Sequence, residues 1–189
     1  MTLIYLVRHG RAAAGWDDHV DPELDATGRA QAAGVRDRLA SIGPLPIVTS
    51  PLRRCRESAA PLAAAWDVAP VVEMGVAEIP SPPGIPMGGR VEWLRIAMRS
   101  TWTELGDRYV TYRDAVTATV LGIAASALAA GGAVVFSHFV AINAAIGSAV
   151  GDDRVLIRRL DNGSITVVEV RDGALRVVES GREADTQIR

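Results

Sequence analysis

Apolar residues along the chain occur either in short unbroken runs or at every third or fourth position of longer segments. The short runs lie at 3–7, 46–49, 71–74 and 133–137. Their length and their polar flanks are typical of buried strands. Segments with helical periodicity lie at about 30–42, 51–65, 90–105, 108–130 and 140–150. Strands that alternate with helices predict an α/β fold with a mostly parallel sheet.

Capping residues predict where the first two helices begin. Asp25 or Thr27 is suited to cap the first helix, which should end before the Gly-Pro pair at 43–44. Ser50 and Pro51 predict the start of the second helix. The serine is expected to be the N-cap there, with the proline at the first helical position.

The C-terminal part of the chain has a different pattern. Segment 164–170 is β-branched and alternating, and it lies between an Asn-Gly pair at 162–163 and an Asp-Gly pair at 172–173. Both dipeptides favour hairpin turns, so we expect an antiparallel meander at one edge of the sheet. Segment 80–89 holds too many prolines and glycines for a regular element and is expected to be a lid or a connector.

These elements together predict a three-layer sandwich. Helices should cover both faces of a mostly parallel sheet that ends in an antiparallel C-terminal edge. The length of 189 residues fits one domain, and no repeat or linker divides the chain. We expect a single domain over 1–189, with 180–189 as a flexible tail.

Composition excludes several classes of protein. Hydrophobic residues make up 49% of the chain and the net charge is −2, which indicates a globular protein and argues against a nucleic-acid-binding tail. All 20 basic residues are arginines. Without lysine there is no Schiff-base, Walker A or kinase lysine, and the cationic chemistry must come from guanidinium groups.

Cysteine usage and hydropathy suggest the compartment. The single cysteine, Cys55, rules out an intramolecular disulfide, and we expect it to be inert packing. The first residues are too few and too soon followed by charge for a signal peptide. The longest apolar stretch, 116–135, is better interpreted as a helix plus a strand than as a membrane span. These patterns predict a cytoplasmic protein with no membrane or nucleic-acid partner.

Polar residues that suit phosphate follow three of the predicted strands. Arg8-His9-Gly10 ends the first strand, and His138 follows the strand at 133–137. Ser50 ends the second strand, and Arg54 lies just inside the next helix. The carboxyl ends of parallel strands lie at one edge of a sheet, so these residues should converge there. Guanidinium, imidazole and backbone N–H groups all donate to a phosphate dianion.

The same segments resemble the histidine phosphatase superfamily, the phosphoglycerate mutase-like proteins. Four segments match that family's motifs, in its order: Arg8-His9-Gly10 and the segments 24–32, 49–59 and 135–138. The resemblance spans residues 3 to about 150. It implies a cofactor-free, metal-independent phosphomonoesterase that forms a phosphohistidine.

The resemblance also assigns roles. It implies that His9 is the nucleophile and that Arg8, Arg54 and His138 hold the phosphoryl oxygens. Arg54, rather than Arg53, falls in the matching position.

A glutamate must protonate the leaving group and later activate water. Glu78 occupies the matching region, with Glu73 and Glu92 as the alternatives.

Three residues near the motifs are candidates for the rim of the substrate site. Arg11 is positioned to extend the positive rim, and Phe139 to provide an apolar wall where relatives have glycine. Asp17 lies near the position of a polar phosphate-side residue in relatives. His19 gives no metal-ligand spacing with the other two histidines, so no metal site is predicted.

Further apolar residues follow the Pro-rich segment at helical spacing. They are Leu94, Met98, Trp102 and Leu105. We interpret this stripe as facing the core.

Three functions remain open at this stage. A phosphatase acting on a small phosphorylated metabolite comes first. A phosphoglycerate mutase is the second, although the span 78–138 lacks the basic insertion usual in such members. A non-catalytic phosphate-binding scaffold is the third. The substrate is not specified by these patterns, and the antiparallel edge leaves a homodimer possible.

Overall fold

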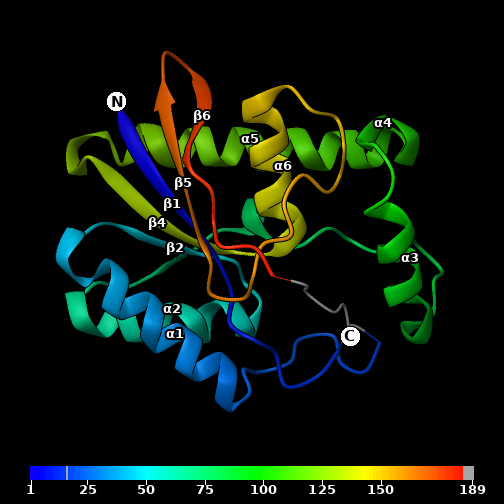
Figure 1. The fold of residues 1–189 in the computed structure, drawn as a ribbon, viewed down its shortest axis with the longest axis horizontal. Coiled ribbons are helices and arrows are strands. Elements are labelled where there is room, and N and C mark those ends of the chain that lie inside the picture. Colours follow the sequence, from blue (N-terminus) through cyan, green and yellow to red (C-terminus); the bar gives the residue numbers. More distant parts are fainter. Residues whose placement is uncertain (16, 185–189) are drawn as a thin grey trace.

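The computed structural model describes residues 1–15 and 17–184, which fold around a six-stranded sheet (Figure 1). The strands are β1 (Thr2–Arg8), β2 (Ile47–Thr49), β3 (Val71–Val72), β4 (Gly132–Ser137), β5 (Ile165–Arg171) and β6 (Ala174–Glu179). Their order is β3-β2-β4-β1-β5-β6. The first four pair in parallel, whereas β5 is antiparallel to β1 and β6 to β5.

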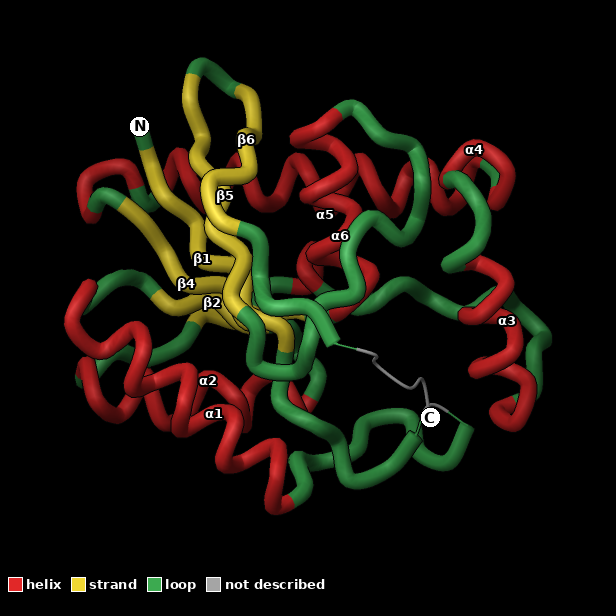
Figure 2. Tube along the Cα trace, viewed as in Figure 1, coloured by secondary structure: helices red, strands yellow, loops and turns green. Residues whose placement is uncertain are grey.

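Helices cover both faces of this sheet, so the predicted fold class is confirmed. The helices are α1 (Ala26–Leu39), α2 (Arg53–Trp66), α3 (Arg90–Ala97), α4 (Trp102–Leu105), α5 (Asp107–Ser126) and α6 (Phe139–Val150). Helices α1 and α2 lie on one face, and α5 and α6 on the other (Figure 1). Helix α3 lies at one end of the molecule, near α4, and packs on the core under α5 and α6 through Leu94 (Figure 2).

Strand β4 is buried along its whole length because it supplies both cores. Ala133 and Val135 belong to the core under α5 and α6, whereas Val134 and Phe136 belong to the core under α1 and α2. Successive side chains of a strand point to opposite faces. This explains why β4 is an unbroken apolar run rather than an alternating one.

The loop after β1 crosses the start of α1 so closely that there is no room for a side chain at Gly10 or at Gly28. A Cβ added to Gly10 would lie 2.4 Å from the Gly28 carbonyl oxygen, and one added to Gly28 would lie 2.1 Å from the Arg11 carbonyl oxygen. Asp25 caps the same helix by accepting from the Gly28 amide at 2.7 Å. Of the two predicted caps, Asp25 is therefore the one used.

The helix expected over 90–105 is broken into two. Helix α3 ends at Ala97, and α4 begins after Thr101, which forms a capping box with Glu104. This cap offers the chain a local alternative to helix continuation. The apolar stripe still packs on the core, because Leu94 and Trp102 are buried in it. Met98 and Leu105 are partly buried against the same core.

Two further local predictions were wrong. Helix α2 starts at Arg53, not Pro51, and Leu52 is its N-cap. The Ser50 hydroxyl is instead bonded to His138. The Asn-Gly pair at 162–163 makes no hairpin, because the element directly before it is helix α6, and β5 pairs with the distant strand β1. The Asp-Gly pair does join β5 to β6, with φ of 52° at Asp172 and 76° at Gly173.

The first residues of the predicted flexible tail contact the rest of the chain. Gly181 donates to Thr166 Oγ1, and Ala184 donates to the Arg159 carbonyl. Arg182 pairs with Asp161 at 2.6 Å. These bonds hold 181–184 against the loop before β5, and 185–189 lie outside the described residues.

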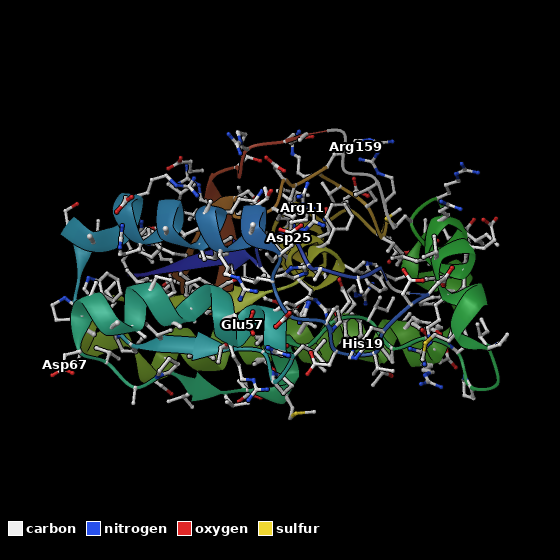
Figure 3. The ribbon with its side chains drawn as sticks, turned by 90° about the horizontal axis from the view of Figure 1, so that it is seen from below. Arg11, His19, Asp25, Glu57, Asp67 and Arg159 are labelled. Atoms are coloured by element: carbon white, nitrogen blue, oxygen red, sulfur yellow. The ribbon has the colours of Figure 1, made fainter. Side chains whose placement is uncertain are left out.

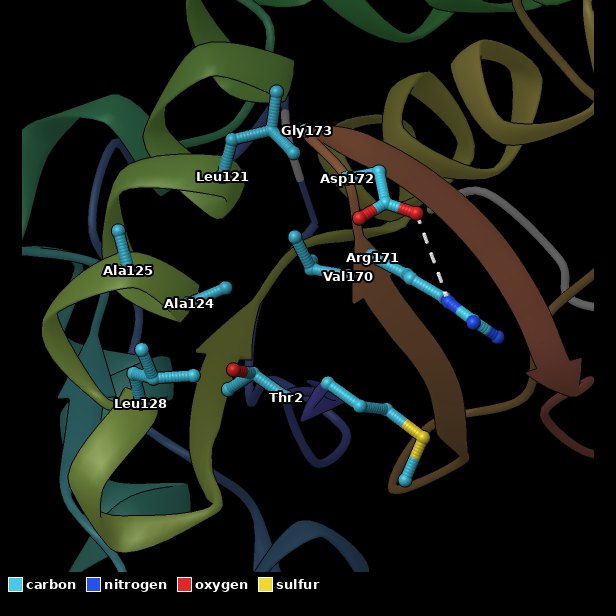
Figure 4. Close-up of a pocket in the computed structure, with 10 residues that line it drawn as sticks. Thr2, Leu121, Ala124, Ala125, Leu128, Val170, Arg171, Asp172 and Gly173 are labelled. Atoms are coloured by element: carbon cyan, nitrogen blue, oxygen red, sulfur yellow. Dashed lines mark ion pairs between the residues drawn. The ribbon is translucent and has the colours of Figure 1, made fainter.

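A pocket of about 360 Å³ lies between α5, the start of β1 and the β5–β6 turn (Figure 4). No helix in the described part of the chain combines the length and the hydropathy needed to cross a membrane.

The Gly10–Gly28 contact leads to a stability prediction. Gly28→Ala should destabilise the fold by about 1–3 kcal/mol, because the new methyl group meets a backbone oxygen that cannot move freely. Gly34 is the control on the same helix, since a Cβ there meets nothing within 4 Å. Gly34→Ala should be neutral or stabilise by up to about 1 kcal/mol. Urea unfolding measures both, and equal effects of the two changes would contradict the packing argument.

Candidate active site

Adjacent parallel strands bring the two predicted site histidines together. Arg8 on β1 is in register with Ser137 on β4, and the His9 amide donates to the Ser137 carbonyl at 3.1 Å. His9 and His138 therefore leave neighbouring strand ends. Their ring centroids are 5.1 Å apart, with 63° between the ring planes. Both side chains are buried.

The guanidinium of Arg54 lies between the two imidazoles. Arg54 Nε donates to His9 Nε2 at 3.2 Å, and Arg54 Nη2 contacts His138 Nδ1 at 3.1 Å. Arg54 is only 4% exposed, whereas Arg53 forms surface ion pairs with Glu23 and Glu57. The structure thus brings Arg54 to the histidines and directs Arg53 elsewhere.

The partners of His9 define its tautomer. Its Nδ1 lies 2.7 Å from the Gly10 carbonyl oxygen, which only accepts, so the ring proton is on Nδ1. Nε2 then carries a lone pair, in agreement with the donor Arg54 that faces it. Burial, together with the charges of Arg54 and Arg8, lowers the pKa of His9 well below its usual value. The ring is therefore neutral at neutral pH, with Nε2 free of a proton.

His138 has the complementary tautomer. Its Nδ1 faces Arg54, which cannot accept, and its Nε2 lies 2.7 Å from Ser50 Oγ. The proton is accordingly on Nε2 and is donated to the serine. Burial and the nearby Arg54 also lower the pKa of His138 well below its usual value.

Arg54 retains a donor for a further ligand. Its Nη1 is buried and has no hydrogen-bond partner among the described residues. A buried guanidinium N–H without a partner is costly, so its presence here points to an acceptor that binds from outside the chain. Anionic oxygens are the acceptors that guanidinium prefers.

Arg8 provides a second buried cation beside this point. Its Nη1 donates to the Leu160 carbonyl at 2.5 Å, and its guanidinium lies 4.8 Å from the centre of the Phe139 ring. Burial lowers the pKa of Arg8 to about 10, which still leaves it charged at neutral pH. Phe139, at the start of α6, thus packs its ring against the Arg8 guanidinium.

Glu78 lies near the charges of Arg8 and Arg54. It is on the segment between the short helix Met74–Val76 and α3. Its Oε1 accepts from the amides of Ile79 and Val140, the latter in the first turn of α6. Its carboxylate acts electrostatically on Arg8. Burial raises the pKa of Glu78, although those hydrogen bonds and the charges of Arg54 and Arg8 oppose the rise.

The backbone that carries Glu78 is fixed by two side chains that sequence reasoning did not assign to the site. Ser137 Oγ donates to the Val76 carbonyl at 2.7 Å. The Tyr112 hydroxyl donates to the Ala77 carbonyl at 2.9 Å. Strand β4 and helix α5 therefore both position the segment that leads into Glu78.

The two alternative glutamates are engaged elsewhere. Glu73 accepts from the Gly75 amide at 2.8 Å and caps the short helix that follows. Glu92 lies on α3 with a largely exposed side chain, paired with Arg95 at 3.3 Å. Neither glutamate contributes to the charge environment of the buried arginine Arg8, whereas Glu78 does.

Arg11 and Asp17 have partners that the predictions did not anticipate. The Arg11 guanidinium turns to Asp25 and Thr27 at the start of α1, at 2.5 and 2.8 Å (Figure 3). Asp17 accepts from the Val91 amide at 2.9 Å and so ties its loop to the first turn of α3. Arg11 is thus bonded to the start of α1, and Asp17 to the start of α3. His19 is exposed on the same loop (Figure 3).

The loop after His9 is held by residues that also escaped sequence reasoning. Asn162 Nδ2 donates to the His9 carbonyl at 2.9 Å, and the Gly163 amide bonds to the Arg8 carbonyl at 3.0 Å. Ser58 Oγ accepts from the Gly10 amide and donates to the Arg54 carbonyl. The sequence predicts a turn at the Asn-Gly pair, but the His9 carbonyl to which Asn162 donates lies 153 positions away along the chain.

The site thus combines two cations, a neutral imidazole whose unprotonated Nε2 accepts from Arg54, and a carboxyl group of raised pKa. The histidine phosphatase superfamily (branch 1) model matches residues 4–182. The chain belongs to the histidine phosphatase superfamily.

Relatives of this histidine phosphatase were found by sequence and by structure. An uncharacterized protein of Mycobacterium tuberculosis, Rv0525, is 40% identical over 72 residues, which cover 36% of each chain. The match therefore spans about a third of the length of that relative.

Solved structures of two named phosphatases share the fold. A mycobacterial glucosyl-3-phosphoglycerate phosphatase, Rv2419c, has a TM-score of 0.78 at 20% identity, covering 97% of this chain and 100% of that one. A phosphoserine phosphatase from Entamoeba histolytica, in complex with 3-phosphoglyceric acid, has a TM-score of 0.73 at 21% identity, covering 98% of each chain.

The Arg54 geometry predicts a binding result for this histidine phosphatase. Arg54→Lys should weaken the binding of inorganic phosphate roughly 10- to 100-fold, because one ammonium group cannot span both imidazoles and the anion. Arg53→Lys is the matched control and should bind phosphate like the wild type. Isothermal titration calorimetry measures both. Unchanged binding by the Arg54 variant, or equal losses in both, would contradict the assignment.

Proposed function

We propose that this protein is a metal-independent phosphomonoesterase that works through a phosphohistidine at His9 Nε2. One observation carries the proposal. The buried guanidinium of Arg54 donates through Nε to the unprotonated His9 Nε2, and its Nη1 has no partner among the described residues. A nucleophile must be unprotonated, and a phosphoryl group needs donors for its oxygens. No group of three or more metal-ligating side chains occurs among the described residues.

The proposed first step transfers the phosphoryl group to the enzyme. Arg8 and Arg54 donate to the phosphoryl oxygens while His9 Nε2 attacks phosphorus, and His138, whose Nδ1 lone pair faces Arg54, orients that guanidinium. The P–N bond forms as the bond to the leaving oxygen breaks. Glu78 gives its proton to that oxygen, so the alcohol departs neutral. The raised pKa of Glu78 supports its role as the acid in this step.

The second step returns the enzyme to its starting state. The Glu78 carboxylate, now unprotonated, takes a proton from a water molecule that attacks phosphorus. The P–N bond breaks and its electron pair returns to Nε2. Inorganic phosphate leaves, and Glu78 is again protonated.

The proposed substrate is a small phosphorylated metabolite. The names of two structural neighbours include glucosyl-3-phosphoglycerate and phosphoserine, both small phosphomonoesters. The pairing of Arg11 with Asp25 and of Arg53 with Glu23 and Glu57 neutralises two nearby cations. A mutase needs additional cations to retain a phosphorylated sugar acid, so these pairings favour hydrolysis over phosphoglycerate mutase chemistry.

The first test is turnover without metal. The wild type should release p-nitrophenol from p-nitrophenyl phosphate in the presence of EDTA. His9→Ala should lower the rate by at least about 10³-fold, since it removes the nucleophile. His19→Ala is the control and should keep full activity. A His9 variant that retains activity would refute the proposed chemistry.

Trapping of the intermediate separates an enzyme from a scaffold. Brief incubation with a phospho-donor followed by alkaline quenching should leave an acid-labile phosphate on the His9 peptide. Its absence with every donor in a panel of phosphomonoesters, 3-phosphoglycerate included, would favour a non-catalytic phosphate-binding protein. Appearance of a rearranged phosphoester instead of free phosphate would identify a mutase.

The acid role of Glu78 predicts a dependence on the leaving group. Glu78→Gln should slow hydrolysis of phosphoserine by about 10²–10⁴-fold, because an alkoxide must be protonated as it leaves. The loss should be much smaller for p-nitrophenyl phosphate, whose leaving group is stable as an anion. Glu73→Gln and Glu92→Gln are controls that should behave like the wild type with both substrates. A large loss confined to either control would move the role to that residue.

The pKa directions predict the pH profile of kcat/KM. His9 must be neutral, and burial lowers its pKa, so the acid limb should lie well below pH 6.5. Glu78 must be protonated in the first step, and burial raises its pKa, so activity should fall as pH rises through a value above 4.5. Glu78→Gln should abolish this alkaline limb. A profile that falls only below neutrality would contradict the assignment.

A further inference from the structure

Residues 77–82, which include Glu78, belong to no helix or strand. The short helix Met74–Val76 ends just before them, and regular structure begins again at Met87. Neither a helix nor a sheet fixes the backbone of such a segment, so its polar groups need partners from elsewhere in the fold. Those partners determine where the Glu78 carboxyl lies.

Both polar groups of Ala77 are bonded. Its amide donates to the Met74 carbonyl at 3.0 Å, and its carbonyl accepts from the Tyr112 hydroxyl at 2.9 Å. The Ala77 carbonyl and the Cα of Glu78 belong to the same peptide plane, which is rigid. The bond from Tyr112 therefore fixes the orientation of the plane from which Glu78 starts.

Neighbouring groups fix the chain on either side of this plane. Ser137 on β4 donates to the Val76 carbonyl at 2.7 Å, and Val76 and Ile79 are buried in the core under α5 and α6. The Oε1 of Glu78 accepts from the amides of Ile79 and Val140 at 3.0 and 3.2 Å. Strand β4 thus holds the backbone before Glu78, α5 holds its peptide plane, and α6 contacts its carboxyl.

The hydroxyl of Tyr112 lies at the end of a packed ring. The centroid of this ring is 5.9 Å from that of Trp102, with 39° between the ring planes, and Trp102 is fully buried. Tyr112 packs against the same core as Val76 and Ile79. A tyrosine side chain has few rotatable bonds, so a packed ring places its hydroxyl within narrow limits.

The phenol of Tyr112 keeps its proton. Burial and, after it, the charge of Glu78 raise the pKa of Tyr112 well above its usual value. The hydroxyl is therefore a donor at neutral pH, as a bond to a carbonyl oxygen requires. The same electrostatic interaction indicates that the phenol and the Glu78 carboxyl lie near each other.

Tyr109 provides a comparison on the same helix. It lies about one turn before Tyr112, is 6% exposed, and its ring centroid is 5.6 Å from that of Trp93. The Tyr109 hydroxyl has no hydrogen-bond partner among the described residues. Both tyrosines pack their rings against the core, and of the two it is Tyr112 that is bonded to the segment of Glu78.

We propose that Tyr112 is a positioning residue for Glu78. Its bond to the Ala77 carbonyl keeps the carboxyl in the orientation from which it can protonate the leaving group. The inference rests on the proposed function for its catalytic part, because Glu78 has the acid role only there. The hold of Tyr112 on the segment can be measured without turnover.

Two tyrosine variants separate positioning from packing, because each removes one hydroxyl and keeps the ring. Tyr112→Phe should lower kcat for phosphoserine about tenfold with KM within about twofold, and should lower kcat for p-nitrophenyl phosphate less than about threefold. Tyr109→Phe is the matched control and should behave like the wild type with both substrates. Equal losses for the two substrates in Tyr112→Phe would indicate a general structural effect and would overturn the proposal.

A double-mutant cycle tests whether Tyr112 acts through Glu78. With phosphoserine, Tyr112→Phe should cause a further loss of less than about twofold when Glu78→Gln is already present, since the acid that it positions is gone. The same tenfold loss in both backgrounds would contradict the proposed role.

The pH profile adds a readout that packing alone would not change. The titratable groups that act on Glu78 are Arg8 from β1, Arg54 and Cys55 from α2, and Tyr112 from α5. In Tyr112→Phe the segment is held less closely, so water reaches the carboxyl and its raised pKa should fall toward its usual value. The alkaline limb of kcat/KM should therefore move to lower pH. Tyr109→Phe should leave this limb in place.

Amide hydrogen exchange, followed by nuclear magnetic resonance, tests the contact itself. Tyr112→Phe should speed exchange of the Ile79 amide about 5- to 10-fold, as expected for the loss of one hydrogen bond near it. Tyr109→Phe should leave that rate unchanged. An unchanged Ile79 rate in Tyr112→Phe would overturn the proposal.

The two proposals can fail separately. If the wild type releases no phosphate from any substrate, the phosphatase proposal fails, and exchange at Ile79 still decides whether Tyr112 holds the segment. If the wild type is active and Tyr112→Phe retains its full rate with phosphoserine, the positioning role fails, and the phosphatase proposal stands.

Discussion

One guanidinium between two imidazoles is the interaction on which the rest of the site depends. Arg54 can only donate, so the nitrogens of His9 and His138 that face it must both keep their lone pairs. Each ring proton is therefore on the far nitrogen, where Gly10 and Ser50 accept it. Burial makes this possible, because it keeps both imidazoles neutral beside a cation.

The scaffold holds these three side chains from three separate elements. His9 and His138 are placed by the β1–β4 register, and Arg54 by the first turn of α2. Ser58 joins two of these elements, since it bonds both to the Gly10 amide and to the Arg54 carbonyl. A shift of α2 would therefore move the guanidinium and the loop after His9 together. This shared support explains how a site made from distant segments keeps a fixed geometry.

Arginine has two distinct uses in this lysine-free chain. At the surface it forms ion pairs, such as those of Arg53 with Glu23 and of Arg113 with Asp153. Exposed pairs of this kind contribute little stability each, typically under about 1 kcal/mol. In the pocket, Arg8 and Arg54 are buried and face the histidines or their strand ends. Because the residue type is the same in both places, burial is what distinguishes the arginines of the site from those at the surface.

The sequence by itself determined the fold class and the main members of the pocket. Alternating strands and helices place His9 and His138 at the carboxyl ends of parallel strands, and the motif order selects Arg54 over Arg53. These are local signals, so they can be recognised in a single chain. The sequence leaves three glutamates as candidates for the acid-base residue, because the Pro-rich segment after Glu78 has no helix or strand pattern that would place it.

Only the tertiary structure decided the contacts between distant segments. Arg11 and Asp17 bond to the first turns of helices. Ser50 bonds to His138. Asn162 donates to the His9 carbonyl. From the sequence alone, each of these polar groups has several possible hydrogen-bond partners. Which partner each one has depends on the positions of chain segments far away, and hydrogen-bond partners become specific only when packing fixes those positions.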